Sequence, residues 1–138
     1  MLHEVLVVDS RPAVLYSIVE ALQSAGYSTA GATTFEEAGG RLKAHPPRLL
    51  LTGIRLGAFN GLHLVIRARF DHPNTASIIL SDAADAVLEA EAGRHGATWL
   101  VRPVGQRALA SAVARVLGAA DQARLALGGF AEAASSHA

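Results

Sequence analysis

The sequence contains no cysteine. Disulfide bonds, thiolate metal sites and a cysteine nucleophile are therefore excluded, although the absence does not fix the cellular compartment. Charge is also scarce, because charged residues make up only 17% of the chain and 12 basic residues balance 12 acidic ones. A formal net charge of zero gives no sign of electrostatic capture of nucleic acid or of an anionic membrane. We expect this chain alone to bind neither.

Long apolar runs are missing as well. No run approaches the ~18–20 residues that cross a bilayer, and His3, Glu4 and Asp9 come too early in the chain for a signal-peptide core. A cytoplasmic protein is the resulting expectation. What is present is a hydrophobic fraction of 51% over 138 residues, enough for one domain with a substantial core.

Short apolar runs that end in small or polar residues are the most informative pattern. Stretches with helical spacing lie between them, which predicts an α/β domain of five strand–helix units with strands buried on both faces. The carboxyl ends of such strands meet at one edge of the sheet, where ligands bind. Residues at these ends are therefore expected to be neighbours in space. The runs are Val5–Val8 before Asp9 and Ser10, Leu49–Thr52 before Gly53, Ile78–Leu80 before Ser81 and Asp82, and Trp99–Val101 before Arg102.

The predicted last helix begins near Gly105 and carries apolar residues at helical spacing up to Leu117. Gly118 then ends or dents it. Residues 1–118 are the predicted domain, and residues 119–138 are an Ala-rich extension, partly helical and frayed over 133–138.

With these elements in order, residues 3–118 resemble the receiver domain of bacterial two-component response regulators. Val5–Asp9 is similar to the family's first strand and the start of its acidic pair, and Asn60-Gly61-Leu62 is similar to the loop after its third strand. Ser81 stands at the switch Ser/Thr position and Trp99 at a position that often holds a switch aromatic. The resemblance implies a flavodoxin-like, doubly wound parallel sheet with strand order 2-1-3-4-5, and a cis peptide bond before Pro103.

The departures from the family pattern are at the residues that carry its chemistry. The resemblance places Gly53 where an Asp accepts phosphate, Ser10 where the second acid stands, Arg102 where a Lys contacts the phosphoryl group, and Gly57 where the loop has a Pro. The sequence therefore indicates an atypical receiver, or pseudo-receiver. Its degenerate phosphorylation pocket would consist of Asp9, Ser10, Gly53, Ser81 and Arg102.

Phosphoryl transfer needs an in-line nucleophile, and Gly53 has no side chain. We expect no catalytic activity and no phosphorylation at this position. Asp9 is the one carboxylate retained, so we expect Mg²⁺ to bind weakly or not at all and no other cofactor to bind. Asp82 is interpreted as a helix cap in preference to a second carboxylate ligand. Arg102 either bridges to Asp9 or Asp82 or extends its head to water; we predict the bridge.

The predicted function is a receiver-like signalling module of a phosphorelay that acts through protein–protein contact. The partner would be a histidine kinase, another regulator or an output protein. The alternatives are a small-ligand-binding α/β domain, since the vacated pocket lies at the habitual ligand edge, and the N-terminal regulatory domain of a longer transcriptional regulator. A homodimer is also predicted through the fourth helix, fifth strand and fifth helix. Its surface would contain Ala86, Ala90, Ala108 and Ala112, flanked by Glu89, Glu91, Arg94, Arg107 and Arg115, with Leu125 and Leu127 of the extension adding to it.

Overall fold

The computed structural model describes the backbone of residues 4–136 and the side chains of residues 4–126. Five parallel strands form one sheet in the order β2-β1-β3-β6-β7, which confirms the predicted order of the five main strands. The register aligns Val8 with both Ala32 and Thr52, and Ser81 with Val101. The strands are β1 (Val5–Val8), β2 (Thr29–Ala32), β3 (Leu49–Gly53), β6 (Ala76–Ser81) and β7 (Thr98–Val101).

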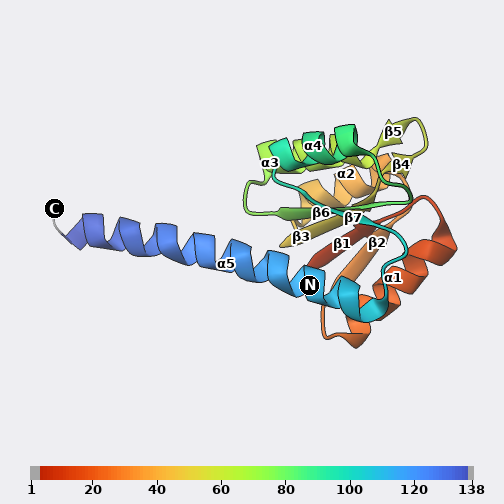
Figure 1. Cartoon of the computed structure of the whole chain (residues 1–138). Helices are drawn as coiled ribbons and strands as arrows, with labels where there is room; N and C mark the ends of the chain where they lie inside the picture. Colours follow the sequence, from red (N-terminus) through yellow and green to blue (C-terminus); the bar gives the residue numbers. More distant parts are fainter. Residues whose placement is uncertain (1–3, 137–138) are drawn as a thin grey trace.

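Helices cover both faces of this sheet. In Figure 1, α2, α3 and α4 lie above the strands, while α1 and the first turns of α5 lie below. One hydrophobic cluster fills the first interface around Leu50 and Leu64, and a second fills the other around Leu51 and Val113. The helices are α1 (Pro12–Ser24), α2 (Phe35–Ala44), α3 (Gly61–Asp71), α4 (Ala86–Arg94) and α5 (Gln106–Ser136).

Local sequence explains where several helices begin and end. Thr34 caps α2 by accepting from the Glu37 backbone N–H at 3.0 Å, a role typical of threonine before a helix. Asn60 caps α3 in the same way through His63. Gly26 follows α1 with a φ of +97°, a conformation that disfavours a side chain. The peptide bond before Pro103 is cis.

Two features of the sheet differ from the sequence prediction. The segment expected as a Gly-rich loop after β3 forms a small antiparallel hairpin of β4 (Arg55–Leu56) and β5 (Phe59–Asn60), turned by Gly57 at a φ of +64°. The prediction that the last strand is buried on both faces is wrong. β7 is an edge strand with one neighbour, so its side chains are half-buried and Val101 is exposed.

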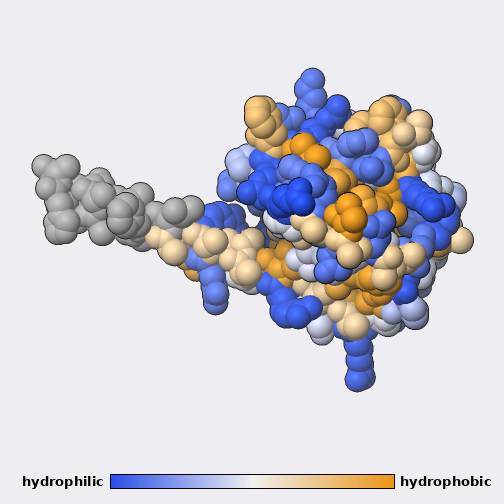
Figure 2. All heavy atoms as spheres, turned by 45° about the horizontal axis from the view of Figure 1, so that its top comes forward, coloured by the Kyte–Doolittle hydropathy of each residue, from blue (hydrophilic) through white to orange (hydrophobic). Residues whose placement is uncertain are grey.

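The last helix continues through Gly118 to Ser136 and projects from the domain at the left of Figure 1. Figure 2 shows from a second direction how the coloured part of this helix leaves the domain. The predicted fraying of residues 133–138 and the predicted contact of Leu127 lie outside the side chains that the structure describes. Within the described residues, no helix combines the length and apolar character that crossing a membrane requires.

Candidate functional site

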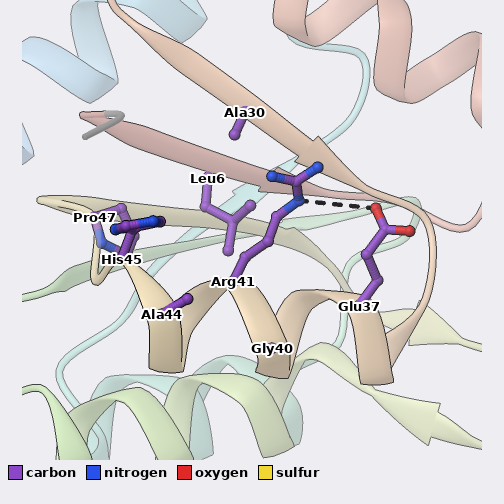
Figure 3. Close-up of a pocket in the computed structure, with 8 residues that line it drawn as sticks. All are labelled: Leu6, Ala30, Glu37, Gly40, Arg41, Ala44, His45 and Pro47. Carbon is purple, nitrogen blue, oxygen red and sulfur yellow. Dashed lines mark ion pairs between the residues drawn. The ribbon is translucent and has the colours of Figure 1, made fainter. Parts of the chain in front are cut away.

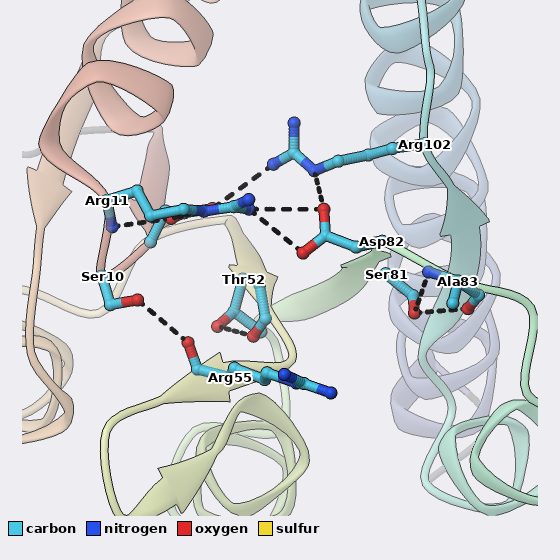
Figure 4. A network of polar contacts seen from close by, with 10 residues as sticks. Ser10, Arg11, Thr52, Arg55, Ser81, Asp82, Ala83 and Arg102 are labelled. Atoms are coloured by element: carbon cyan, nitrogen blue, oxygen red, sulfur yellow. Dashed lines mark hydrogen bonds and ion pairs between the residues drawn. The ribbon is translucent and has the colours of Figure 1, made fainter.

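The carboxyl ends of the strands bring polar side chains together at one edge of the sheet (Figure 4). Asp9 directly follows β1 and is only 3% exposed. Arg102 directly follows β7, on the far side of the sheet order, yet its Nη2 lies 3.3 Å from Oδ2 of Asp9. The bridge predicted for Arg102 is therefore confirmed, and its guanidinium does not extend freely to water.

Asp9 is bound more extensively by a residue that the sequence reasoning missed. The backbone N–H of Arg11 donates to Asp9 Oδ1 at 2.9 Å, and its Nε donates to the same oxygen at 3.1 Å. Nη2 of Arg11 also donates to Oδ2 at 3.3 Å. The hydrogen bond with Asp9 is the main cause that raises the pKa of Arg11 above its ordinary value. Both oxygens of the buried carboxylate are thus occupied by guanidinium groups.

Asp82 completes the arrangement, and its predicted capping role is wrong. α4 begins at Ala86, and its cap is Asp85, which accepts from the Leu88 backbone N–H at 3.0 Å. Asp82 instead accepts from Nη2 of Arg11 at 3.4 Å. It also lies 3.3 Å from Nε of Arg102, an ion-pair distance without hydrogen-bond geometry, since that buried Nε has no hydrogen-bond partner among the described residues.

These four residues form what we call the ion-pair cluster: Asp9, Arg11, Asp82 and Arg102. Two carboxylates and two guanidinium groups balance in formal charge. A buried carboxylate is costly unless it is paired and hydrogen-bonded, and Asp9 is both. The negative charges of Asp9 and Asp82 are therefore balanced by the two arginines of the same cluster.

Gly53 ends β3 beside this cluster. Its φ is not positive, so the backbone there does not require glycine. A Cβ at this position would lie 3.2 Å from Oδ2 of Asp9 and 3.8 Å from the Val8 carbonyl oxygen. The carboxylate of Asp9 thus partly occupies the space next to the strand end.

The remaining predicted site residues point to other partners. The hydroxyl of Ser10 donates to the Arg55 carbonyl at 3.2 Å. Ser81 is buried, and its hydroxyl donates to the carbonyl of Ala83 at 2.6 Å within its own loop (Figure 4). Trp99 packs, half-buried, against the hydrophobic cluster on the α2–α4 side, and its indole Nε1 has no hydrogen-bond partner among the described residues.

The donor set does not fit a divalent metal. Mg²⁺ needs oxygen ligands in near-octahedral geometry, commonly including one or two carboxylates. Here the two carboxylates of the ion-pair cluster already bind guanidinium groups, and Gly53 supplies no ligand. Across the residues that the structure describes, no three His, Asp or Glu side chains gather as a metal site.

Two cavities lie near the upper face of the sheet. One of about 570 Å³ opens beside the ion-pair cluster, between the β4–β5 hairpin and the loop before α4, and Asp82, His63 and Arg55 line it. The other, of about 450 Å³, is a groove between β2 and α2 (Figure 3). Leu6, Ala30 and Gly40 line its mainly apolar wall, and the ion pair of Arg41 with Glu37 stands at its rim.

Comparison with known proteins gives one family. The model of the response regulator receiver domain matches residues 5–114. No curated protein sequence matches the chain.

Solved structures with the same fold include a CheY-like receiver domain protein from Methanospirillum hungatei, 24% identical with a TM-score of 0.83, the match covering 88% of this chain and 98% of that one. NtrX from Brucella abortus is 23% identical with a TM-score of 0.85, over 93% of this chain and 29% of that one. The beryllofluoride-activated NtrC4 receiver domain dimer is 19% identical with a TM-score of 0.79, over 84% and 97% respectively.

Proposed function

The chain belongs to the response regulator receiver domain family of two-component signalling, and from this premise we propose that it is a pseudo-receiver. In this proposal it accepts no phosphate at the end of β3, has no catalytic activity of its own and acts through contact with another signalling protein. The observation that carries the proposal is Gly53, which offers no side-chain oxygen where the pocket would need a nucleophile.

The ion-pair cluster supports the same conclusion from the other reacting groups. Phosphoryl transfer depends on metal ions and cationic side chains that neutralise the charge on the phosphoryl oxygens. Arg11 and Arg102 instead neutralise Asp9 and Asp82 within the chain. The carboxylates are thereby withdrawn from a metal, and we propose that Mg²⁺ and other cofactors bind weakly or not at all.

A receiver without phosphate has no phosphate-driven shift between conformations, so its interaction surface is fixed or is set by a partner. We place that surface on α4, β7 and α5, and propose a second copy of the chain, a histidine kinase, another regulator or an output protein as what it contacts. A bacterial, cytoplasmic setting and the absence of nucleic-acid and membrane binding by this chain alone belong to the same proposal.

Two alternative functions each have one observation in their favour. The cavity of about 570 Å³ beside the ion-pair cluster is of the size of small-ligand sites, which favours a small-ligand-binding domain. The NtrX structure from Brucella abortus is more than three times longer than the part that matches this chain, which favours a regulatory domain of a longer transcriptional regulator.

The decisive experiment exposes the full chain to acetyl phosphate with Mg²⁺ and follows its intact mass, and to beryllofluoride while following fluorine NMR. We expect no added phosphate and no bound beryllofluoride. The NtrC4 receiver domain, which is beryllofluoride-activated in its solved structure, is the positive control. A phosphate mapped by peptide mass spectrometry to the strand-end pocket would overturn the pseudo-receiver proposal.

A further inference from the structure

A second polar cavity lies at the opposite edge of the sheet from the ion-pair cluster. Its volume is about 410 Å³, and the amino end of β6 contributes Ala76 and Ser77 to its wall. Asp82 directly follows the other end of this strand, so Ser77 and Asp82 are about 17 Å apart at the usual strand rise. The cavity is therefore separate from the degenerate phosphorylation pocket.

The charged groups that line this cavity are all cationic or able to become so. Arg69 comes from the end of α3, His95 from the turn after α4, and Arg124 from the projecting part of α5. Among the residues that the structure describes, no carboxylate lines the cavity. Two of these groups already have a carboxylate partner outside the lining, because His95 is 3.5 Å from Glu91 and Arg124 pairs with Asp121.

Arg69 is the cation with unused capacity. Among the described residues its side chain has no ion pair or hydrogen bond. Its guanidinium lies close against Gly96, where an added Cβ would come within 2.5 Å of Nη1. Gly96 has a φ of +76°, so both its backbone and the approach of Arg69 suit glycine.

Ser77 supplies a second unused group at the floor of the cavity. The residue is only 6% exposed, and its hydroxyl has no hydrogen-bond partner among the described residues. The hydroxyl oxygen is not among the described buried atoms that lack a partner, so it is open to solvent, where water or a ligand can satisfy it. Here the hydroxyl faces a space that is large enough for a ligand and is flanked by cations.

We propose that this cavity binds a small phosphomonoester. A guanidinium presents paired N–H donors that match phosphate oxygens, which fits Arg69, and the Ser77 hydroxyl adds a neutral donor beside it. The cavity volume lies within the range of small-molecule sites. His95, when protonated, and Arg124 add positive charge around the phosphate.

The ligand would also contact α5 beyond Leu117, because Ala120, Ala123 and Arg124 form one wall. A bound phosphate would thus connect the projecting part of α5 to the amino end of β6. This connection is independent of the strand-end pocket and of whether that pocket is phosphorylated.

The test is a titration of the full chain with inorganic phosphate at constant ionic strength, followed by backbone amide NMR. We expect saturable shifts at Ser77, Gly96 and Arg124. Arg69→Gln and Ser77→Ala should each weaken binding at least tenfold. Arg67→Gln is the matched control, since Arg67 lies on the same helix but stacks on Phe35 and does not line the cavity.

Three results of this titration would contradict a phosphate site in the cavity. Shifts that grow linearly without saturation, that persist unchanged in Arg69→Gln, or that centre on Asp9 and Arg102 would overturn it. A repeat with glycerol phosphate should give the same shifts with additional ones on α5. Amide spectra of the two cavity variants that otherwise overlay on the unmodified protein show that any loss is local.

Discussion

At the residue scale, the negative charge of the buried Asp9 carboxylate is neutralised by two guanidinium groups. Arg11 contributes a backbone N–H and its side chain, while Arg102 contributes a second guanidinium from across the sheet. Partly exposed ion pairs contribute little to stability, about 0–1 kcal/mol each. Their main effect here is on the chemistry of the pocket, because both carboxylates already bind guanidinium groups and a metal ion would have to compete with these for them.

Removing that competing charge should therefore increase metal affinity. In Arg102→Gln, and more so in Arg11→Gln with Arg102→Gln, we expect Mg²⁺ to bind at least about tenfold more tightly, a change of about 1.4 kcal/mol. Trp99 is the only tryptophan and lies three residues before Arg102, so its fluorescence reports the titration. Saturation of the unmodified protein at sub-millimolar Mg²⁺, or no gain in the double variant, would contradict this view of the cluster.

The sequence predicts which residues meet at the sheet edge, because the fold topology determines this. It predicts less well which side chains pair with one another there. Asp9, Gly53 and Arg102 meet because parallel strands end at one edge, which the apolar runs already predict. Arg11 was missed, although a donor two residues after Asp9 was the available signal. Asp82 and Asp85 are both acceptable caps by residue type, and only the position of the first turn of α4 decides between them.

At the element scale, two glycines in helices differ in whether a side chain would fit at their position. Gly61 begins α3 so close to β3 that an added Cβ would be 2.0 Å from the Gly53 carbonyl oxygen. Gly40 lies inside α2, exposed, with nothing within 4 Å of its added Cβ. Neither glycine has a positive φ, so the two positions differ in the contacts that an added Cβ would make.

We expect Gly61→Ala to lower the free energy of unfolding by about 1–3 kcal/mol, because the start of α3 must move away from β3. Gly40→Ala, the matched control, should raise it by about 0.5–1 kcal/mol through helix propensity. Urea unfolding followed by circular dichroism measures both. Equal effects of the two substitutions would mean that the approach of α3 to Gly53 is not tight in solution.

The base of the projecting helix is held by a second ion-pair group. Arg48, which precedes β3, pairs with Asp121 through one nitrogen at 2.6 and 2.5 Å and with Glu4 at 3.2 Å. The hydrogen bond from Arg48 is the main cause that lowers the pKa of Asp121 below its ordinary value of 3.8, and a bond from Arg124 adds to it. The same contact raises the pKa of Arg48.

Because the folded-state pKa of Asp121 is lowered, its contribution to stability is present above pH 3.8 and is lost as the pH falls through the folded value. We expect Asp121→Asn to melt at a lower temperature than the unmodified protein at neutral pH. The difference should shrink below pH 3.8 and disappear in stronger acid. Gln122→Ala, at the neighbouring exposed position, should show no such dependence, and a gap that persists in strong acid would assign the effect to packing.

The elements themselves were largely predictable, since buried strands and amphipathic helices have distinct periods. The β4–β5 hairpin was not, because each of its strands has two residues and too short a pattern to read. The half-exposure of β7 follows from its place at the sheet edge, which no property of Trp99–Val101 alone reveals. Gly118 neither ends nor interrupts α5, since the helix continues on both sides of it.

At the scale of the whole molecule, burial changes which residues can belong to the proposed dimer surface on α4, β7 and α5. Ala112 is 1% exposed, so it packs in the core and cannot contribute to a homodimer. Glu91 and Arg94 already pair with each other at 2.7 Å. The large apolar side chains that the described part of this face presents to solvent include Val87 on α4, Val101 on β7 and Leu125 on α5, and the predicted contribution of Leu125 to a dimer stays a prediction.

We expect sedimentation or light scattering at tens of micromolar to show a dimer. Arg107→Glu with Arg115→Glu should weaken it, and Val87→Glu should do the same by placing charge at its centre. Lys43→Glu on α2, the same charge reversal as each single arginine substitution, should leave it intact. A monomer of 14.3 kDa would exclude the dimer, and a dimer insensitive to all the α4 and α5 variants would place its interface on another face.

The length of α5 has a mechanical consequence. From Asp121, the described residue of α5 that Arg48 pairs with, to Ser136 the axis extends about 22 Å at the usual helical rise. Over that length, a tilt of about 10° at the base moves the far end by about 4 Å. A small change in the helix direction at the Arg48–Asp121 contact therefore produces a larger displacement at the far end of α5.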